Sequence, residues 1–203
     1  MTRTLLLTAV VFAALSLAAC NKPASTTAAD ATRVAQAATD KTQDAMGAAV
    51  GQASATTLGS HDTGAFVSNA SQSDMYEIQA AQIAQARSKT FAVKGFAKMM
   101  VADHTALTAA MKPLVAAAGR TPADKLDQRR QGFIDNLKSA NDADFDKTYV
   151  DQQVAAHEEA LALMTGYASD GSDVGLKAGA ATAAPKVQAH LDRIRSIQAG
   201  LKS

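Results

Sequence analysis

The sequence predicts an all-α protein, an up-and-down helical bundle over residues 62–203 preceded by a flexible tether. Strong helix formers outnumber β-branched and aromatic residues, and aromatic residues make up only 4% of the chain. From residue 62 onward apolar residues recur at spacings of three, four and seven, which is the period of an amphipathic helix. No segment alternates with the period of a strand.

The first 19 residues are expected to be an export signal. Arg3 precedes an apolar run at residues 5–17, which is too short to span a bilayer because a spanning helix needs about 20 residues. This pattern is typical of a secretory signal peptide. A Leu-Ala-Ala-Cys sequence at residues 17–20 resembles the bacterial lipobox. We therefore expect residues 1–19 to be a lipoprotein signal peptide and Cys20 to be lipidated; an ordinary signal peptide with an unrelated cysteine is the alternative.

The lipobox resemblance also implies a location. It implies three acyl chains on Cys20, and several chains hold a protein on a membrane where one chain binds only marginally. Asn21 stands where an aspartate would signal retention in the inner membrane. The expected protein is an outer-membrane lipoprotein that faces the periplasm, with the membrane as its partner through the lipid anchor. A net charge of +1 argues against nucleic acid as a partner, and the sequence identifies no protein partner.

Residues 20–61 are expected to be a low-complexity tether between the lipid and the bundle. They are rich in alanine, threonine, serine, glutamine and aspartate, and no aromatic residue occurs in this segment. Such a composition buries too little apolar surface to offset the conformational entropy lost on folding. We expect a flexible or transiently helical spacer.

Five helices are expected in the bundle, at residues 63–89, 90–118, 122–139, 142–168 and 173–202. Asp62 is expected to cap the first, and Pro122 suits the first helical position of the third. Pro113 should kink the second helix, and Pro185 should kink or break the last. A helix of about 17 residues covers roughly 25 Å, so the third can carry the chain back along the bundle. One such crossover is the arrangement of ferritin-like bundles.

Three of the four histidines lie in the middle of long helices, inside their apolar stripes. They are His104, His157 and His190, and Glu77 is the carboxylate of the first helix best placed to face inward. All four lie about 14 to 17 residues from the expected starts of their helices, so we expect them at one level of the bundle. His61 precedes the first helix and is expected to be exposed.

Two functions are compatible with these histidines, because buried imidazoles must hydrogen-bond, pair or bind a metal. In the first, they form a satisfied polar core with Glu77, Asp103, Glu158 or Tyr149, and the bundle is non-catalytic with a structural, interaction or stress-related role in the envelope. In the second, they bind zinc, iron or copper in a metal-binding or redox protein. Glu77 would be the fourth ligand.

Other chemistry has little support in the sequence. The residue three before each inward histidine is a valine (Val101, Val154 and Val187), so the Glu-x-x-His motif is missing and dinuclear iron is disfavoured. Nucleotide-binding glycine motifs and a nucleophile elbow are absent, so the sequence does not favour an enzyme. The single cysteine excludes an intramolecular disulfide. Arg129 and Arg130 are expected on a solvated helix face.

The helical segments resemble a bacterial exported family, the domain of unknown function 4142, classed as ferritin-like. The resemblance covers residues 62–202 and is carried by segments 66–70, 77–78, 93–104, 149–157 and 185–191. The three inward histidines stand in their expected segments. The resemblance implies the fold and an envelope location, and it implies no reaction.

Overall fold

The computed structural model describes residues 28–201. Six α-helices and one short 3-10 helix follow one another, and no strand occurs between residues 28 and 201, which confirms the all-α prediction. The export signal and Cys20 lie outside the described residues. The elements are α1 (Ala28–Thr56), η1 (Leu58–Ser60), α2 (Thr63–Arg87), α3 (Phe91–Ala117), α4 (Gln128–Ser139), α5 (Phe145–Asp170) and α6 (Val174–Gly200).

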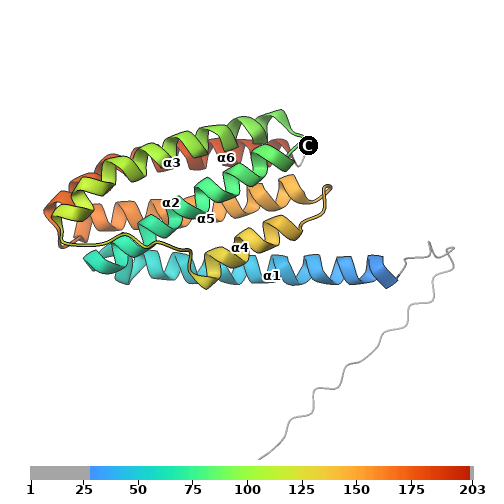
Figure 1. The fold of residues 1–203 in the computed structure, drawn as a ribbon, viewed down its shortest axis with the longest axis horizontal. Coiled ribbons are helices and arrows are strands. Elements are labelled where there is room, and N and C mark those ends of the chain that lie inside the picture. Colours follow the sequence, from blue (N-terminus) through green and yellow to red (C-terminus); the bar gives the residue numbers. More distant parts are fainter. Residues whose placement is uncertain (1–27, 202–203) are drawn as a thin grey trace, which may run out of the picture.

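Two antiparallel hairpins form the centre of the bundle (Figure 1). One consists of α2 and α3, the other of α5 and α6, and the hairpins meet where α3 packs on α6 and α2 packs on α5. Between the hairpins the chain returns along the bundle through an extended segment and α4. Because of this return, α3 and α5 run in the same direction, as the single-crossover topology requires.

The crossover contains less helix than expected, since α4 begins at Gln128 rather than near residue 122. Asp127 caps α4 by accepting a hydrogen bond from the backbone N–H of Arg130. In the extended part, the backbone N–H of Ala123 donates to Ser71, and that of Asp127 donates to Gln72. Side chains of α2 thus satisfy backbone donors in this segment.

Residues 28–56, expected to be part of a flexible tether, form α1, and this part of the prediction is wrong. Helix α1 packs along α5 and α4 (Figure 1), and two glycines permit the close approach. A Cβ atom at Gly51 would lie 1.9 Å from the carboxylate of Glu159, and one at Gly47 would lie 2.8 Å from the ring of Phe133. The helix therefore docks without large apolar side chains because its backbone comes close to its neighbours.

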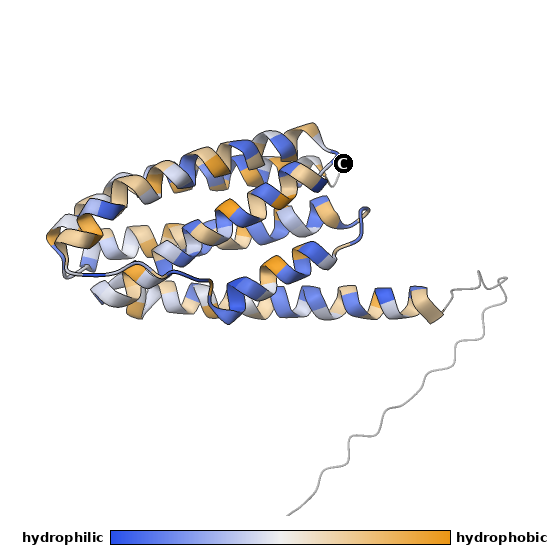
Figure 2. Cartoon of the chain, viewed as in Figure 1, coloured by the Kyte–Doolittle hydropathy of each residue, from blue (hydrophilic) through white to orange (hydrophobic). Residues whose placement is uncertain are grey.

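Both helix-internal prolines are accommodated. Helices α3 and α6 continue through Pro113 and Pro185, so the break considered at Pro185 does not occur. Both prolines are exposed, where water can hydrate the carbonyl group that lacks its helical donor. Hydrophobic and hydrophilic residues are interspersed along every helix (Figure 2), and none of the described helices has the length and hydropathy needed to cross a membrane.

The core consists of two apolar clusters, one toward each end of the bundle. The first includes Phe96, Tyr149 and Ile194, and the second includes Phe66, stacked on Tyr167 at 3.9 Å between ring centroids. On α3, α5 and α6, the predicted histidines stand between the residues of these two clusters. The apolar clusters therefore enclose a polar level near the middle of the bundle.

Candidate metal centre

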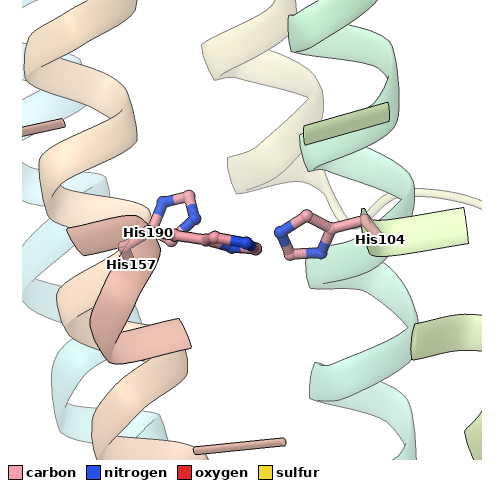
Figure 3. Close-up of side chains that lie close together, drawn as sticks. All are labelled: His104, His157 and His190. Carbon is pink, nitrogen blue, oxygen red and sulfur yellow. The ribbon is translucent and has the colours of Figure 1, made fainter. Parts of the chain in front are cut away.

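Three helices each contribute one histidine to the polar level. His104 of α3, His157 of α5 and His190 of α6 are at most 3% exposed. Their ring centroids are 5.8, 5.5 and 5.5 Å apart, so the rings form a nearly equilateral triangle. Figure 3 shows the rings turned toward one another across the interior. The structure thus brings together the three histidines that the apolar stripes single out.

One nitrogen of each ring is held from outside the triangle. His104 Nδ1 lies 2.8 Å from a carboxylate oxygen of Asp74 on α2. His190 Nε2 lies 2.8 Å from Asp103 on α3, and His157 Nδ1 lies 2.8 Å from the backbone carbonyl of Gln153. All three partners are acceptors, so each of these nitrogens carries the hydrogen and donates it.

The remaining nitrogens face the triangle with their lone pairs. They are His104 Nε2, His157 Nε2 and His190 Nδ1, and each is buried without a hydrogen-bond partner among the described residues. One nitrogen from each ring lies within 4.8 Å of those of the other two. Two nitrogens bound to one zinc ion are at most about 4 Å apart, since each bond is about 2.0–2.1 Å long. The spacing of up to 4.8 Å is therefore slightly wider than one ion would require.

The outer partners are themselves fixed, as in metal sites where ligating histidines donate their second nitrogen to a carboxylate or carbonyl. Asp74 also accepts a hydrogen bond from Thr108 at 2.7 Å. Asp103 also pairs with Lys186 at 3.1 Å. Each carboxylate is thereby oriented by a second donor, which holds the imidazole in one tautomer.

Glu77, the predicted fourth ligand, is buried beside the triangle but does not join it. Its Oε1 lies 3.7 Å from His157 Nδ1, the nitrogen that faces away from the other histidines, and it is not part of the converging group. Burial raises the pKa of Glu77 to about 7. Both Glu77 oxygens, the Gln153 amide and the Tyr149 hydroxyl form no hydrogen bond of normal geometry within the described part of the chain, although the Gln153 side chain is close enough to Glu77 to act against the rise in its pKa. Unpaired buried polar atoms therefore extend from the triangle toward Glu77.

The three imidazoles differ in basicity. Burial lowers the pKa of His157 to about 3, which keeps this ring neutral and ready to donate a lone pair. Burial also lowers the pKa of His190, against the hydrogen bond to Asp103. Burial acts on His104 in the same direction, but the hydrogen bond to Asp74 and the charge of Glu77 outweigh it and raise its pKa above 6.5. His104 is thus the imidazole of the three that holds a second proton most readily.

Sequence reasoning named Asp103 as a partner but missed Asp74 and the Gln153 carbonyl. A signal for Asp74 was present, because it lies three residues before Glu77 and therefore on the same side of α2. The two other partners considered are engaged differently. Glu158 pairs with Arg195 at the surface, and the Tyr149 hydroxyl bonds to none of the three histidines.

A second buried polar cluster lies where α1, α4 and α5 meet, and it corrects the expectation that Arg129 and Arg130 are solvated. Arg130 is only 3% exposed and Glu159 only 6%. Glu159 accepts from Arg129 at 2.8 Å through both oxygens and from Arg130 at 2.6 Å. Arg129 also donates to the backbone carbonyl of Gly47 on α1. This cluster joins the three helices and leaves neither Glu159 oxygen unpaired.

Comparison with known proteins identifies one related family. The family described as "Domain of unknown function (DUF4142)" matches residues 47–197, a span that includes the three histidines and the acceptors of their outer nitrogens. No curated protein and no solved structure matches the chain.

Proposed function

Because the chain belongs to the DUF4142 family, whose description assigns no activity, we propose from the geometry that the protein binds one transition-metal ion. The ligands are His104 Nε2, His157 Nε2 and His190 Nδ1. One observation carries the proposal: each outer nitrogen has an acceptor, while the three inward nitrogens converge without any partner in the described chain.

The energetics of burial favour a ligand at this point. A buried polar atom without a partner costs about 1–3 kcal/mol, and three such atoms meet here. In the competing function, a structural polar core, the histidines would satisfy one another. While all three rings are neutral, the outer nitrogens carry the hydrogens and the inward ones present only lone pairs, which cannot hydrogen-bond to one another. A second proton on His104, whose pKa is raised, gives one inward donor and leaves at least one inward lone pair unpaired. A cation accepts all three at once.

The donor set limits the kind of ion. Three neutral imidazoles suit zinc, copper or iron, whereas magnesium and calcium prefer oxygen ligands. Three histidine ligands leave the fourth position of a tetrahedral zinc ion open for water or a small molecule. We therefore propose a metal-binding bundle in which one coordination position of the ion is not filled by histidine, and we assign no reaction to it.

The test is metal titration of the chelator-stripped protein by calorimetry, with elemental analysis of the product. Zn²⁺, Cu²⁺ and Fe²⁺ are each added to the wild type and to His104→Gln, His157→Gln and His190→Gln. We expect one equivalent of at least one ion to bind the wild type at micromolar concentration or tighter, and each substitution to abolish that binding.

His61→Gln is the matched control, since His61 is exposed and outside the converging group. It should bind as the wild type does. Absence of binding by the folded wild type, or equal loss in the control, would exclude the three-histidine site and leave the structural role.

The sequence near Cys20 supports a location for this function in the bacterial envelope, anchored to the outer membrane by lipid. Residues 17–20 carry the lipobox resemblance, and Asn21 is compatible with outer-membrane sorting. Radiolabelled palmitate should be incorporated into the wild type but not into Cys20→Ser. Asn21→Asp should move the protein to the inner-membrane fraction. An unlabelled wild type would contradict the anchor while leaving the metal site untouched.

A further inference from the structure

An apolar pocket of about 400 Å³ lies next to the three-histidine centre. Residues of α2, α3, α5 and α6 form its walls, and apolar side chains such as Phe66, Met111 and Val187 predominate. Small-molecule sites are typically clefts of roughly 300–1,000 Å³ with an apolar lining and few polar groups. Metal binding by the histidines makes no use of this space.

The pocket is long relative to its volume. Both His104 and Ala116 line it, and they lie 12 positions apart on α3, which corresponds to about 18 Å at 1.5 Å per residue. The lining residues of α2 likewise extend from Phe66 to Asp74, so the pocket runs along the helices. This shape fits an extended chain better than a compact molecule.

Two exposed cations belong to the pocket lining. They are Lys112 and Arg120, and neither forms an ion pair within the described residues. Asp74 is the one acidic residue of the lining, and its oxygens are already engaged by His104 and Thr108. The pocket lining thus combines mostly apolar side chains with two exposed cations.

We propose that this pocket binds a linear fatty acid. The acyl chain lies along α3 toward His104, where it removes apolar surface from water. The carboxylate pairs with Arg120 and Lys112, because guanidinium and ammonium groups form strong charge-assisted hydrogen bonds with carboxylates. The carboxylate lies away from the three histidines, and only the far end of the acyl chain approaches His104, so acyl binding does not require a bound metal ion.

The test compares dodecanoate with dodecanol, which has the same chain length but no charge. Binding of each ligand is measured by calorimetry on protein from which non-covalently bound lipid has been removed. A chelator is present, so the result does not depend on whether the three histidines bind a metal. Dodecanoate should bind the wild type more tightly than dodecanol. The double variant Lys112→Gln/Arg120→Gln should weaken dodecanoate binding at least about tenfold and leave dodecanol within about twofold.

Two further variants complete the design. Ala70→Leu extends a side chain into the pocket from α2 and should weaken both ligands, provided that circular dichroism shows native helix content. Lys94→Gln/Lys98→Gln removes two exposed charges of α3 outside the lining and should change neither affinity. Failure of the wild type to bind dodecanoate, or unchanged dodecanoate binding by Lys112→Gln/Arg120→Gln, would overturn the proposal.

Discussion

Two buried polar clusters lie two residues apart on α5, one around His157 and the other around Glu159. In the second, both oxygens of Glu159 accept hydrogen bonds from arginine side chains of α4. In the first, the outer nitrogens are paired, but the three inward nitrogens have no partner in the described residues. Buried polar groups in folded proteins are normally satisfied. The comparison therefore separates a cluster in which the described chain pairs both carboxylate oxygens from one in which it leaves three inward nitrogens unpaired.

The two clusters also differ in what they hold together. The Glu159 cluster connects α1 and α4 to the outside of α5, through Arg129 and the carbonyl of Gly47. The histidine cluster lies between the two hairpins of the bundle. The Glu159 cluster thus joins helices to one another, whereas the histidine cluster lies in the interior that the helices form. Four predictions test this contrast.

The largest effect is expected from Glu159→Gln. Removing the charge leaves the buried Arg130 with Asp127 as its remaining ion-pair partner and leaves Arg129 with none in the described residues. Breaking a buried ion pair costs about 3–5 kcal/mol. The free energy of unfolding, measured with urea, should fall by about this amount, while metal affinity should stay close to that of the wild type. Glu158→Gln, which breaks an exposed pair with Arg195, should cost no more than about 1 kcal/mol. Equal losses in the two variants would contradict the structural role of Glu159.

A smaller change is expected from metal added to the wild type. A ligand at 100 times its dissociation constant stabilises the folded state by about 2.7 kcal/mol. Urea unfolding with and without the ion that binds in calorimetry should show this increase for the wild type and none for His157→Gln. If His157→Gln gains as much stability as the wild type, the ion binds elsewhere.

Next in size is Asp74→Ala, which removes the acceptor of His104 Nδ1 without removing a metal ligand. Loss of such an outer partner typically lowers metal affinity about 10- to 100-fold. Calorimetric titration should show this decrease. Asp135→Ala makes the same charge change on the exposed side of α4 and should bind metal as the wild type does. An unaltered affinity in Asp74→Ala would mean that the outer partners do not orient the ligands.

The smallest effect concerns the docking of α1. Burial raises the pKa of Asp44 above 3.8, against the hydrogen bonds from Gln152 and Asn136. A raised pKa means that the folded state binds the proton more tightly, so this contribution to stability is complete below pH 3.8 and is lost as the pH rises through the folded-state pKa. Asp44→Asn should therefore lose less stability than the wild type over that interval in urea unfolding. Identical pH profiles would contradict this role of Asp44.

Local spacing predicted much of the bundle. The helices α2, α3, α5 and α6 and their inward faces follow from apolar residues at intervals of three and four, which depend only on nearby residues. The same spacing placed His104, His157, His190 and Glu77 toward the interior. Their common level followed from counting residues along each helix. The position of Glu77 beside the triangle rather than in it could not be obtained in this way, because it depends on how far each helix is rotated and shifted.

The chain sequence therefore specified the helices α2, α3, α5 and α6, the inward histidines and the residue types available to bind an ion, since all three depend on neighbouring positions. Assembly of the helices settled three other matters: the docking of α1, the burial of Arg130, and which nitrogen of each imidazole faces the centre. Each depends on groups far apart in the chain, such as Gly51 against Glu159 or Asp74 against His104. Helix periodicity carries no information about such pairs, because their distances arise only when the helices pack.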